Sequence, residues 1–126
     1  MLIRYKKNLE KMAMGLLAFM PEEKNVKTLQ ETMNEYETND NWHLYLWRED
    51  SIIGAIGVRI ENELDAVVQH ISVNPSHRNL GIGKRMVDEV TRKYEKEYVV
   101  CPNEATEAFF NKCSEQSTEE DSSEEE

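Results

Sequence analysis

The chain has 126 residues, which suits a single domain, and 39% of them are hydrophobic, which is enough to form a core. Its net charge of −10 is uneven: the segment 114–126 holds seven acids and no base, which leaves 18 acids against 15 bases elsewhere. This balance provides no broad basic face, so nucleic-acid binding is not expected. No stretch approaches the roughly 18 apolar residues of a membrane span. Because no secretory leader is visible either, we expect a cytoplasmic protein without membrane contacts.

The cysteines, the histidines and the acidic segment limit the chemistry further. Cys101 and Cys113 do not make a disulfide framework, and the histidines show no zinc-ligand spacing, so no metal is expected. The segment 114–126 contains no apolar residue and cannot bury a core. We therefore expect one domain over 1–113, followed by a disordered acidic tail over 114–126 that folding does not need.

In the first half of the chain, the apolar spacing changes from that of a strand to that of helices and back again. Residues 2–5 alternate, as strands do, and two later stretches place apolar residues every three or four positions, as helices do. Pro21 is expected to end the first helix. The expected elements are a strand over 2–5, helices over 9–17 and 26–36, and an antiparallel meander of strands over 42–47, 52–60 and 65–73.

The second half predicts a helix, a short strand and a last helix. Apolar residues recur at helical spacing over 82–94, and residues 98–101 suit a short buried strand. Pro102 and Asn103 are ordinary residues for the start of a helix. The order of elements indicates a mixed α/β fold.

The turn between the strand over 65–73 and the helix over 82–94 is the most informative segment. It contains Arg78, Gly81, Gly83 and Lys84, and glycine lets a ligand approach the main chain closely. The N–H groups at the start of a helix lack internal partners, and together with the helix dipole they attract anions. The two cations add charge. The segment therefore predicts a diphosphate-binding site.

Two other phosphate motifs do not fit this turn. A P-loop requires an earlier glycine and a hydroxyl directly after Lys84, where the chain has Arg85. A dinucleotide fingerprint requires a third glycine at position 86, which is Met86. The remaining alternative is an ordinary strand-to-helix turn whose glycines only make it tight.

The same turn carries a resemblance to a known family. The pattern Arg78-x-x-Gly81-x-Gly83, entered from a strand ending in Ser72-Val73, resembles the acetyl-CoA signature Gln/Arg-x-x-Gly-x-Gly/Ala of the GNAT superfamily of N-acetyltransferases. The resemblance extends over residues 1–113. It implies a mixed, mainly antiparallel sheet flanked by helices, and direct transfer of an acetyl group from acetyl-CoA to an amine. In overall sequence the chain also resembles small GNAT-like proteins associated with bacterial riboflavin operons.

The resemblance implies which residues hold the cofactor. In the family, backbone groups of the strand before the loop hold the pantetheine arm, beside a β-bulge that splays this strand from the next. The N–H of Val73 is the candidate oxyanion donor. Phe109 matches a position that lines the cofactor, although it also suits a core position. The implied cofactor-binding residues are Ile71, Ser72, Val73, Arg78, Asn79, Leu80, Gly81, Ile82, Gly83, Lys84, Asn103 and Phe109.

The resemblance leaves the catalytic base open. Gln69 matches a position where some members place a base, but an amide cannot titrate. His70 beside it is the candidate, because imidazole exchanges protons near neutral pH; its alternative role is that of a hydrogen-bonded sheet residue. Alternation along the strand places these two side chains on opposite faces unless the bulge shifts them. Glu63 and Asp65 are further candidates or residues of a solvated turn, and Cys101 is interpreted as a small buried hydrophobe.

Two departures from the family pattern bear on activity. Many members have Phe-Tyr in the last helix, where the Tyr protonates the leaving thiolate, but this chain has Phe109-Phe110. The family also continues with two further strands that often pair between subunits, so we expect a C-terminally truncated domain whose open acceptor side a homodimer would cover. The alternative to an enzyme is a sensor or partner module that binds CoA or acetyl-CoA with little or no transferase activity.

Overall fold

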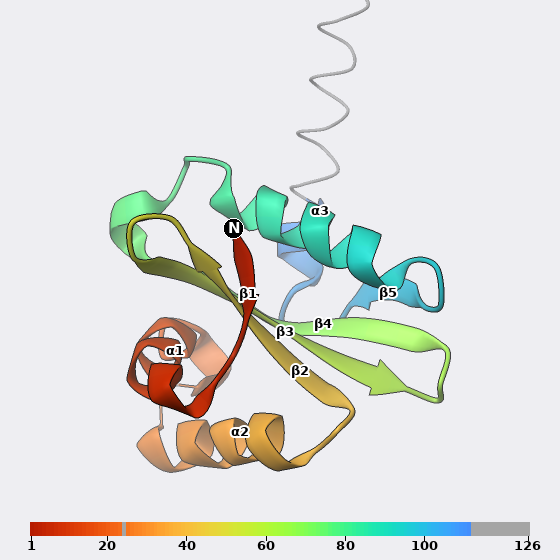
Figure 1. Cartoon of the computed structure of the whole chain (residues 1–126), viewed down its shortest axis with the longest axis horizontal. Helices are drawn as coiled ribbons and strands as arrows, with labels where there is room; N and C mark the ends of the chain where they lie inside the picture. Colours follow the sequence, from red (N-terminus) through yellow and green to blue (C-terminus); the bar gives the residue numbers. More distant parts are fainter. Residues whose placement is uncertain (24, 112–126) are drawn as a thin grey trace, which may run out of the picture.

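A computed structural model describes residues 1–23 and 25–111. Within them, α1 and α2 cover one face of a sheet and α3 covers the other (Figure 1). The elements are β1 (Leu2–Arg4), η1 (Lys7–Leu9), α1 (Glu10–Leu17), η2 (Pro21–Glu23), α2 (Val26–Thr38), β2 (Trp42–Arg48), β3 (Ile52–Glu61), β4 (Asp65–Val73), η3 (Pro75–His77), α3 (Ile82–Tyr94) and β5 (Val99–Pro102). Helical residues follow over 107–111. The expected tail and Cys113 lie outside the described residues. No helix in the described ranges is long and apolar enough to cross a bilayer.

The strands of the described residues form one five-stranded sheet in the order β1-β2-β3-β4-β5. Neighbouring strands run antiparallel, except that β4 and β5 are parallel. The meander from β2 to β4 and the mixed, mainly antiparallel sheet flanked by helices are thus confirmed. The helix expected over 82–94 has those same bounds in α3.

Two prolines have other roles than the sequence predicts. Pro21 does not end α1, which stops at Leu17. It begins η2 instead, because a proline suits the first position of a helical turn, where its missing N–H costs no bond. Pro102, expected at the start of the last helix, is the last residue of β5. The turn after it starts at Asn103, whose side-chain Oδ1 accepts a bond of 3.1 Å from the N–H of Thr106.

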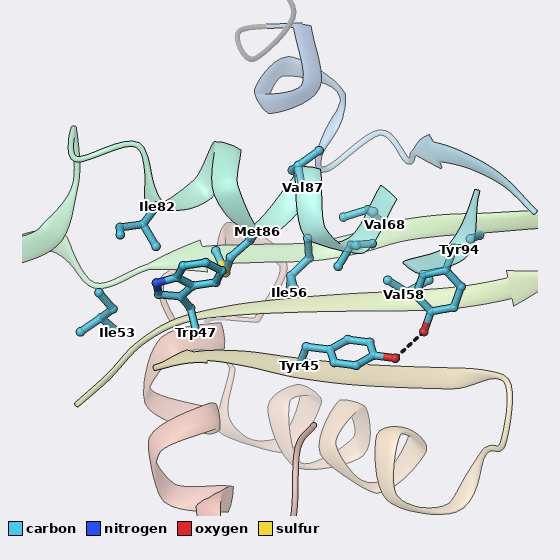
Figure 2. Close-up of a cluster of buried hydrophobic side chains, with 12 residues drawn as sticks. Tyr45, Trp47, Ile53, Ile56, Val58, Val68, Ile82, Met86, Val87 and Tyr94 are labelled. Atoms are coloured by element: carbon cyan, nitrogen blue, oxygen red, sulfur yellow. Dashed lines mark hydrogen bonds between the residues drawn. The ribbon is translucent and has the colours of Figure 1, made fainter. Parts of the chain in front are cut away.

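Each face of the sheet carries its own apolar cluster because side chains alternate along a strand. On β2, Leu44 and Leu46 pack with α1 and α2, whereas Tyr45 and Trp47 pack under α3. Figure 2 shows the second cluster, in which Met86 of α3 lies between β-strand side chains. Strand β2 is therefore covered by apolar contacts on both faces.

A β-bulge lies in β4 where the family resemblance implies one. Gly57 of β3 pairs with His70, and Val58 pairs with Val68, so Gln69 is an extra residue in β4. The bulge turns the side chains of Gln69 and His70 toward the same face. Both contact the hydroxyl of Tyr36 in α2, at 2.9 Å and 2.5 Å. The strict alternation of these two residues is therefore interrupted here.

Strand β4 separates from β5 at Val68, the residue directly before the bulge residue Gln69. The parallel pairing runs from Asp65–Val99 to Val68–Pro102 and ends there. At this point the hydroxyl of Thr106 donates a bond of 2.6 Å to the carbonyl of Val68, which fixes the last helical segment beside β4. Beyond Val68, no described strand covers this edge of β4, and a wedge opens toward the loop before α3.

Candidate functional site

The open edge of β4 presents backbone groups toward the wedge. The N–H of Asn74 donates to the carbonyl of Ile53 in β3 at 2.8 Å. In an antiparallel ladder, successive residues turn their N–H and C=O groups to alternate sides. The N–H and C=O groups of Ile71 and Val73 therefore point away from β3, toward the wedge. Those of Ser72 point toward β3. An extended amide chain can pair with such an edge.

A cavity of about 510 Å³ lies at this wedge. Its walls come from the segment after α1, the end of β4, the loop before α3 and the last helical segment. The lining residues are Phe19, Met20, Pro21, Ile71, Ser72, Val73, His77, Arg78, Asn79, Gly81, Ile82, Gly83, Lys84, Ala105, Ala108 and Phe109.

Most of the residues that the sequence assigns to a cofactor line this cavity, with two differences. Leu80 is 65% exposed and does not line it, because the loop turns this side chain outward. Asn103 is also outside the lining, since its side chain is engaged in the bond to Thr106. Both residues flank the cavity, and their backbone and capping roles position the residues that form it.

The loop before α3 has the geometry of an anion site. Asn79 and Gly81 both have positive φ, at 69° and 77°. Gly81 caps α3, and the first bond within the helix runs from the N–H of Arg85 to its carbonyl at 3.1 Å. The N–H groups of Ile82 and Gly83 precede this bond, so they have no carbonyl of their own helix to pair with. They point where the helix dipole is positive, toward the cavity mouth.

Gly83 is a glycine because of a neighbouring ring. A Cβ on Gly83 would lie 2.3 Å from Cζ of Phe109. The ring of Phe109 thus packs directly on the first turn of α3, and it also touches the cluster under α3. Phe109 therefore packs against the core, as one interpretation of the sequence expects, and it also lines the cavity. Its contact with a cofactor stays a prediction.

Arg78 does not point its charge into the loop. Its guanidinium lies 5.8 Å from the ring centre of Phe19, and its Nε donates to the carbonyl of Val73 at 3.3 Å. It thus spans the cavity from the loop to the segment after α1. In this conformation the carbonyl of Val73, which faces the wedge, is already hydrogen-bonded to Arg78.

The candidate base His70 is buried behind the cavity rather than in its lining. Its Nδ1 lies 2.5 Å from the hydroxyl of Tyr36, and its Nε2 lies 3.0 Å from Oε1 of Glu23 in η2. Both ring nitrogens are therefore engaged by the protein. Accepting a proton from an amine would require one of these bonds to open.

The other candidates for proton transfer lie elsewhere. Asp65 pairs with Val99 at the far end of β4, and Glu63 lies exposed in the turn before it. Burial raises the pKa of the Cys101 thiol, and the nearby carboxylate of Asp65 raises it further. A raised pKa disfavours the nucleophilic thiolate. Cys101 is only half-buried, however, and not buried as the sequence led us to expect, because β5 lies at the edge of the sheet. In the described ranges no group of three or more His, Cys, Asp or Glu could hold a metal ion.

The wall formed by Phe19, Met20 and Pro21 is not predicted by the sequence. This segment has no motif, and Pro21 in particular indicates only a break in helix. Phe19 is a large apolar side chain that is 46% exposed. Such exposure points to a binding site only when the residues around it are known from the structure. Ala105 and Ala108 are small residues at the spacing of one helical turn, and they leave room beside β4.

Comparisons with known proteins agree with this geometry. The profile of the acetyltransferase (GNAT) family matches residues 9–114. An uncharacterized N-acetyltransferase in the lysA 3′ region of Bacillus methanolicus is 55% identical over 114 residues, which is 90% of this chain and 94% of that protein.

Solved structures share the fold. The aminoglycoside acetyltransferase AAC(6′)-Iy, in complex with a bisubstrate analogue, has a TM-score of 0.69 at 19% identity, over 93% of this chain and 87% of that one. A GNAT family acetyltransferase from Elizabethkingia anophelis with acetyl-CoA bound has a TM-score of 0.62 at 19% identity, over 79% of this chain and 63% of that one. With a family profile that spans most of its length and a close relative of nearly equal size, the chain belongs to the acetyltransferase (GNAT) family.

Proposed function

We propose that the protein transfers an acetyl group from acetyl-CoA to an amine. The observation that carries this proposal is the continuity of one cavity. It joins the open edge of β4, which can pair with an amide chain, to the N-terminus of α3, which can bind a diphosphate. These are the two chemistries that CoA presents along its length.

The backbone has the main part in the proposed binding. Ile71 and Val73 would pair with the two amides of the pantetheine arm, and the N–H groups over 79–84 would surround the diphosphate. The Val73 N–H is the proposed oxyanion donor, and one such donor is typically worth about 3 kcal/mol in the transition state. Ser72 has another role, because its hydroxyl donates to the carbonyl of Leu16 at 2.6 Å and holds α1 against β4.

The proposed reaction needs only one bond exchange. The amine nitrogen attacks the thioester carbonyl carbon, the C–S bond breaks, and the proton lost by the nitrogen ends on the sulfur of CoA. His70 as the base stays a prediction, and it requires the bond to Tyr36 or to Glu23 to open. The acceptor is an amine of unassigned class. Because of the resemblance to the riboflavin-operon protein RibT, flavin-pathway amines belong among those tested.

The second candidate function is CoA or acetyl-CoA binding without transfer. Phe110 favours it, because a Tyr there would supply the proton for the leaving thiolate in many relatives. An acetyl-CoA consumption assay separates the two. The panel holds small amines, aminoglycosides, flavin-pathway amines and peptide N-termini, and amine-free hydrolysis is the control. Consumption that depends on an amine supports the enzyme. Calorimetric CoA binding with no consumption supports the sensor, and no binding at millimolar CoA contradicts both.

A matched pair of variants tests whether the loop holds the diphosphate. A Cβ at Gly81 meets no atom within 4 Å, and Asn and Asp tolerate positive φ better than other residues. Gly81→Asn and Gly81→Asp therefore differ in charge and scarcely in shape. We expect Gly81→Asn to keep CoA affinity within a few-fold and Gly81→Asp to weaken it at least about tenfold, because a carboxylate opposes anion binding at a helix N-terminus. Equal affinities would place the diphosphate elsewhere.

A further inference from the structure

A chain of hydrogen-bonded side chains crosses the interior between α2 and β4, and it includes His70, the predicted base. Glu23, Tyr36, Gln69 and His70 are each less than 10% exposed. At the outer end, Arg59 forms an ion pair with Glu61. The bonds are Arg59 Nη1 to Gln69 Oε1 at 3.3 Å, Gln69 Nε2 to Tyr36 Oη at 2.9 Å, Tyr36 Oη to His70 Nδ1 at 2.5 Å, His70 Nε2 to Glu23 Oε1 at 3.0 Å, and Thr32 Oγ1 to Glu23 at 3.0 Å.

The two ends of the chain fix the direction of every bond between them. A guanidinium only donates, so Arg59 must meet the amide oxygen of Gln69, which turns the amide NH₂ toward Tyr36. The Tyr36 hydroxyl accepts that bond. Its other partner among the described residues is Nδ1 of His70, so we assign the hydroxyl proton to that nitrogen. Since Nδ1 then accepts, the proton of the neutral imidazole lies on Nε2 and points to Glu23.

The packing keeps Tyr36 in its place as a neutral donor. Burial raises the pKa of the Tyr36 phenol, and the carboxylate of Glu23 raises it further, although the bond from Gln69 lowers it. A Cβ on Gly57 would lie 1.8 Å from the Tyr36 hydroxyl oxygen. The phenol thus sits directly over the backbone of β3 at the bulge, and no larger residue at position 57 would leave it room.

The inner end of the chain lies next to the cofactor cavity. Glu23 belongs to η2, and its N–H donates to the carbonyl of Met20, which lines the cavity together with Pro21. His70 directly precedes Ile71, which lines the opposite wall. The bond between Glu23 and His70 therefore joins the two walls from behind.

We propose that the chain from Arg59 to Glu23 is a positioning device for the cofactor cavity. It holds His70 neutral, with the proton on Nε2, and through that proton it fastens the segment after α1 to β4 at the width that CoA requires. In this proposal Glu23, His70 and Tyr36 are positioning residues that touch no substrate, and this role of His70 takes the place of the predicted role as base. The positioning role concerns the cavity that would bind CoA, so this part of the inference rests on the proposed function. The position of the proton on His70 does not depend on that function.

Nitrogen NMR of His70 in the full chain tests the direction of the bonds without any ligand. In wild type we expect an unprotonated Nδ1 and a protonated Nε2 at neutral pH. Tyr36→Phe removes the donor to Nδ1, so we expect the Nδ1 signal to move toward that of a nitrogen without a hydrogen bond. An imidazolium, or a proton on Nδ1 in wild type, would overturn the proposed direction. This result stands even if the protein binds no CoA.

Calorimetric CoA titration tests the positioning role. We expect Tyr36→Phe and Glu23→Leu to weaken CoA binding about tenfold and to raise KM for acetyl-CoA more than they lower kcat. Glu23→Gln keeps an oxygen that accepts from Nε2, so we expect it to restore most of the affinity lost in Glu23→Leu. Tyr5→Phe is the matched control, because it removes a tyrosine–glutamate bond of 2.8 Å to Glu37, far from the cavity.

Three outcomes contradict the positioning role. Wild-type affinity in folded Tyr36→Phe would show that the chain does not set the cavity. A fall in kcat with unchanged CoA affinity would instead assign His70 to proton transfer. Equal losses in Glu23→Gln and Glu23→Leu would mean that the carboxylate charge, and not a bond from neutral His70, holds the segment. If Glu23→Leu fails to fold, the comparison of Glu23→Gln and Tyr36→Phe with wild type still decides.

Discussion

Gly81 and Gly83 lie two positions apart and are glycines for different physical reasons. Gly81 has φ of 77° and open space around its missing Cβ, so the backbone conformation and not crowding selects it. Gly83 has ordinary helical angles, but the Phe109 ring occupies the place of its Cβ. The sequence alone gives both residues the same explanations, either the approach of a ligand or a tight turn. The structure separates conformation at one position from packing at the other.

The contact between Gly83 and Phe109 predicts strong coupling. Gly83→Ala alone should lower the free energy of unfolding by about 1–3 kcal/mol, the usual range for overpacking, because the ring must leave the first turn of α3. With Phe109→Ala present, the ring that the added methyl would meet is gone, so the second substitution should cost much less. Urea unfolding of the two single variants and the double variant measures this cycle. Additive losses would contradict the direct contact.

At the scale of elements, a second polar chain on the other face of the sheet repeats the direction of the first. Arg4 of β1 donates to the hydroxyl of Tyr45 at 3.4 Å, and this hydroxyl lies 2.7 Å from that of Tyr94 in α3 (Figure 2). Tyr94 lies 2.6 Å from Nδ1 of His43, whose Nε2 lies 2.8 Å from the carbonyl of Asp40. Because a carbonyl only accepts, Nε2 of His43 carries the proton of that bond.

This second chain predicts how stability depends on pH. Burial lowers the pKa of His43 from its ordinary value of 6.5, and the charge of Arg4 adds to this effect, against an opposing bond to Asp40. The unfolded chain then binds more protons, so stability is lost as pH falls from 6.5 toward the lowered pKa. Urea unfolding between pH 5 and 8 should show a smaller acid loss in His43→Gln than in wild type. If the free energy of unfolding changes with pH in the same way in both proteins, His43 does not contribute to the loss of stability in acid.

The elements that the sequence predicts best are those with long, regular periodicity. The spacing over 82–94 gives α3 its correct bounds, since thirteen residues present one apolar stripe without a break. The bulge at Gln69 was implied by the family resemblance alone, because one extra residue leaves no trace in composition. The pairing of Glu23 with His70 was out of reach, since the two lie 47 positions apart and both types are usually exposed.

At the scale of the whole molecule, the sheet is continuous at one end and divided at the other. The last paired residues, Val68 and Pro102, mark the end of the continuous part. From there, β4 stays with β3, whereas the chain after β5 turns at Asn103. It is held by the bond from Thr106 to Val68 and by the packing of Phe109 on α3. The site lies in the divided part, between elements that belong to different halves of the chain. Local patterns predict the walls from the end of β4 and the loop before α3. They predict neither the wall of Phe19, Met20 and Pro21 nor the distance between the walls.

The division of the sheet leaves an unprotected edge inside the molecule, and amide hydrogen exchange should reveal it residue by residue. The N–H groups of Ile71 and Val73 face the wedge, so they should exchange rapidly without ligand, while the Ser72 N–H, bonded toward β3, should exchange slowly. Saturating CoA should slow Ile71 and Val73 and leave Ser72 as it is. Protection that covers all three alike would point to general tightening of the sheet. The alternating pattern would instead show the cofactor behaving as the missing strand.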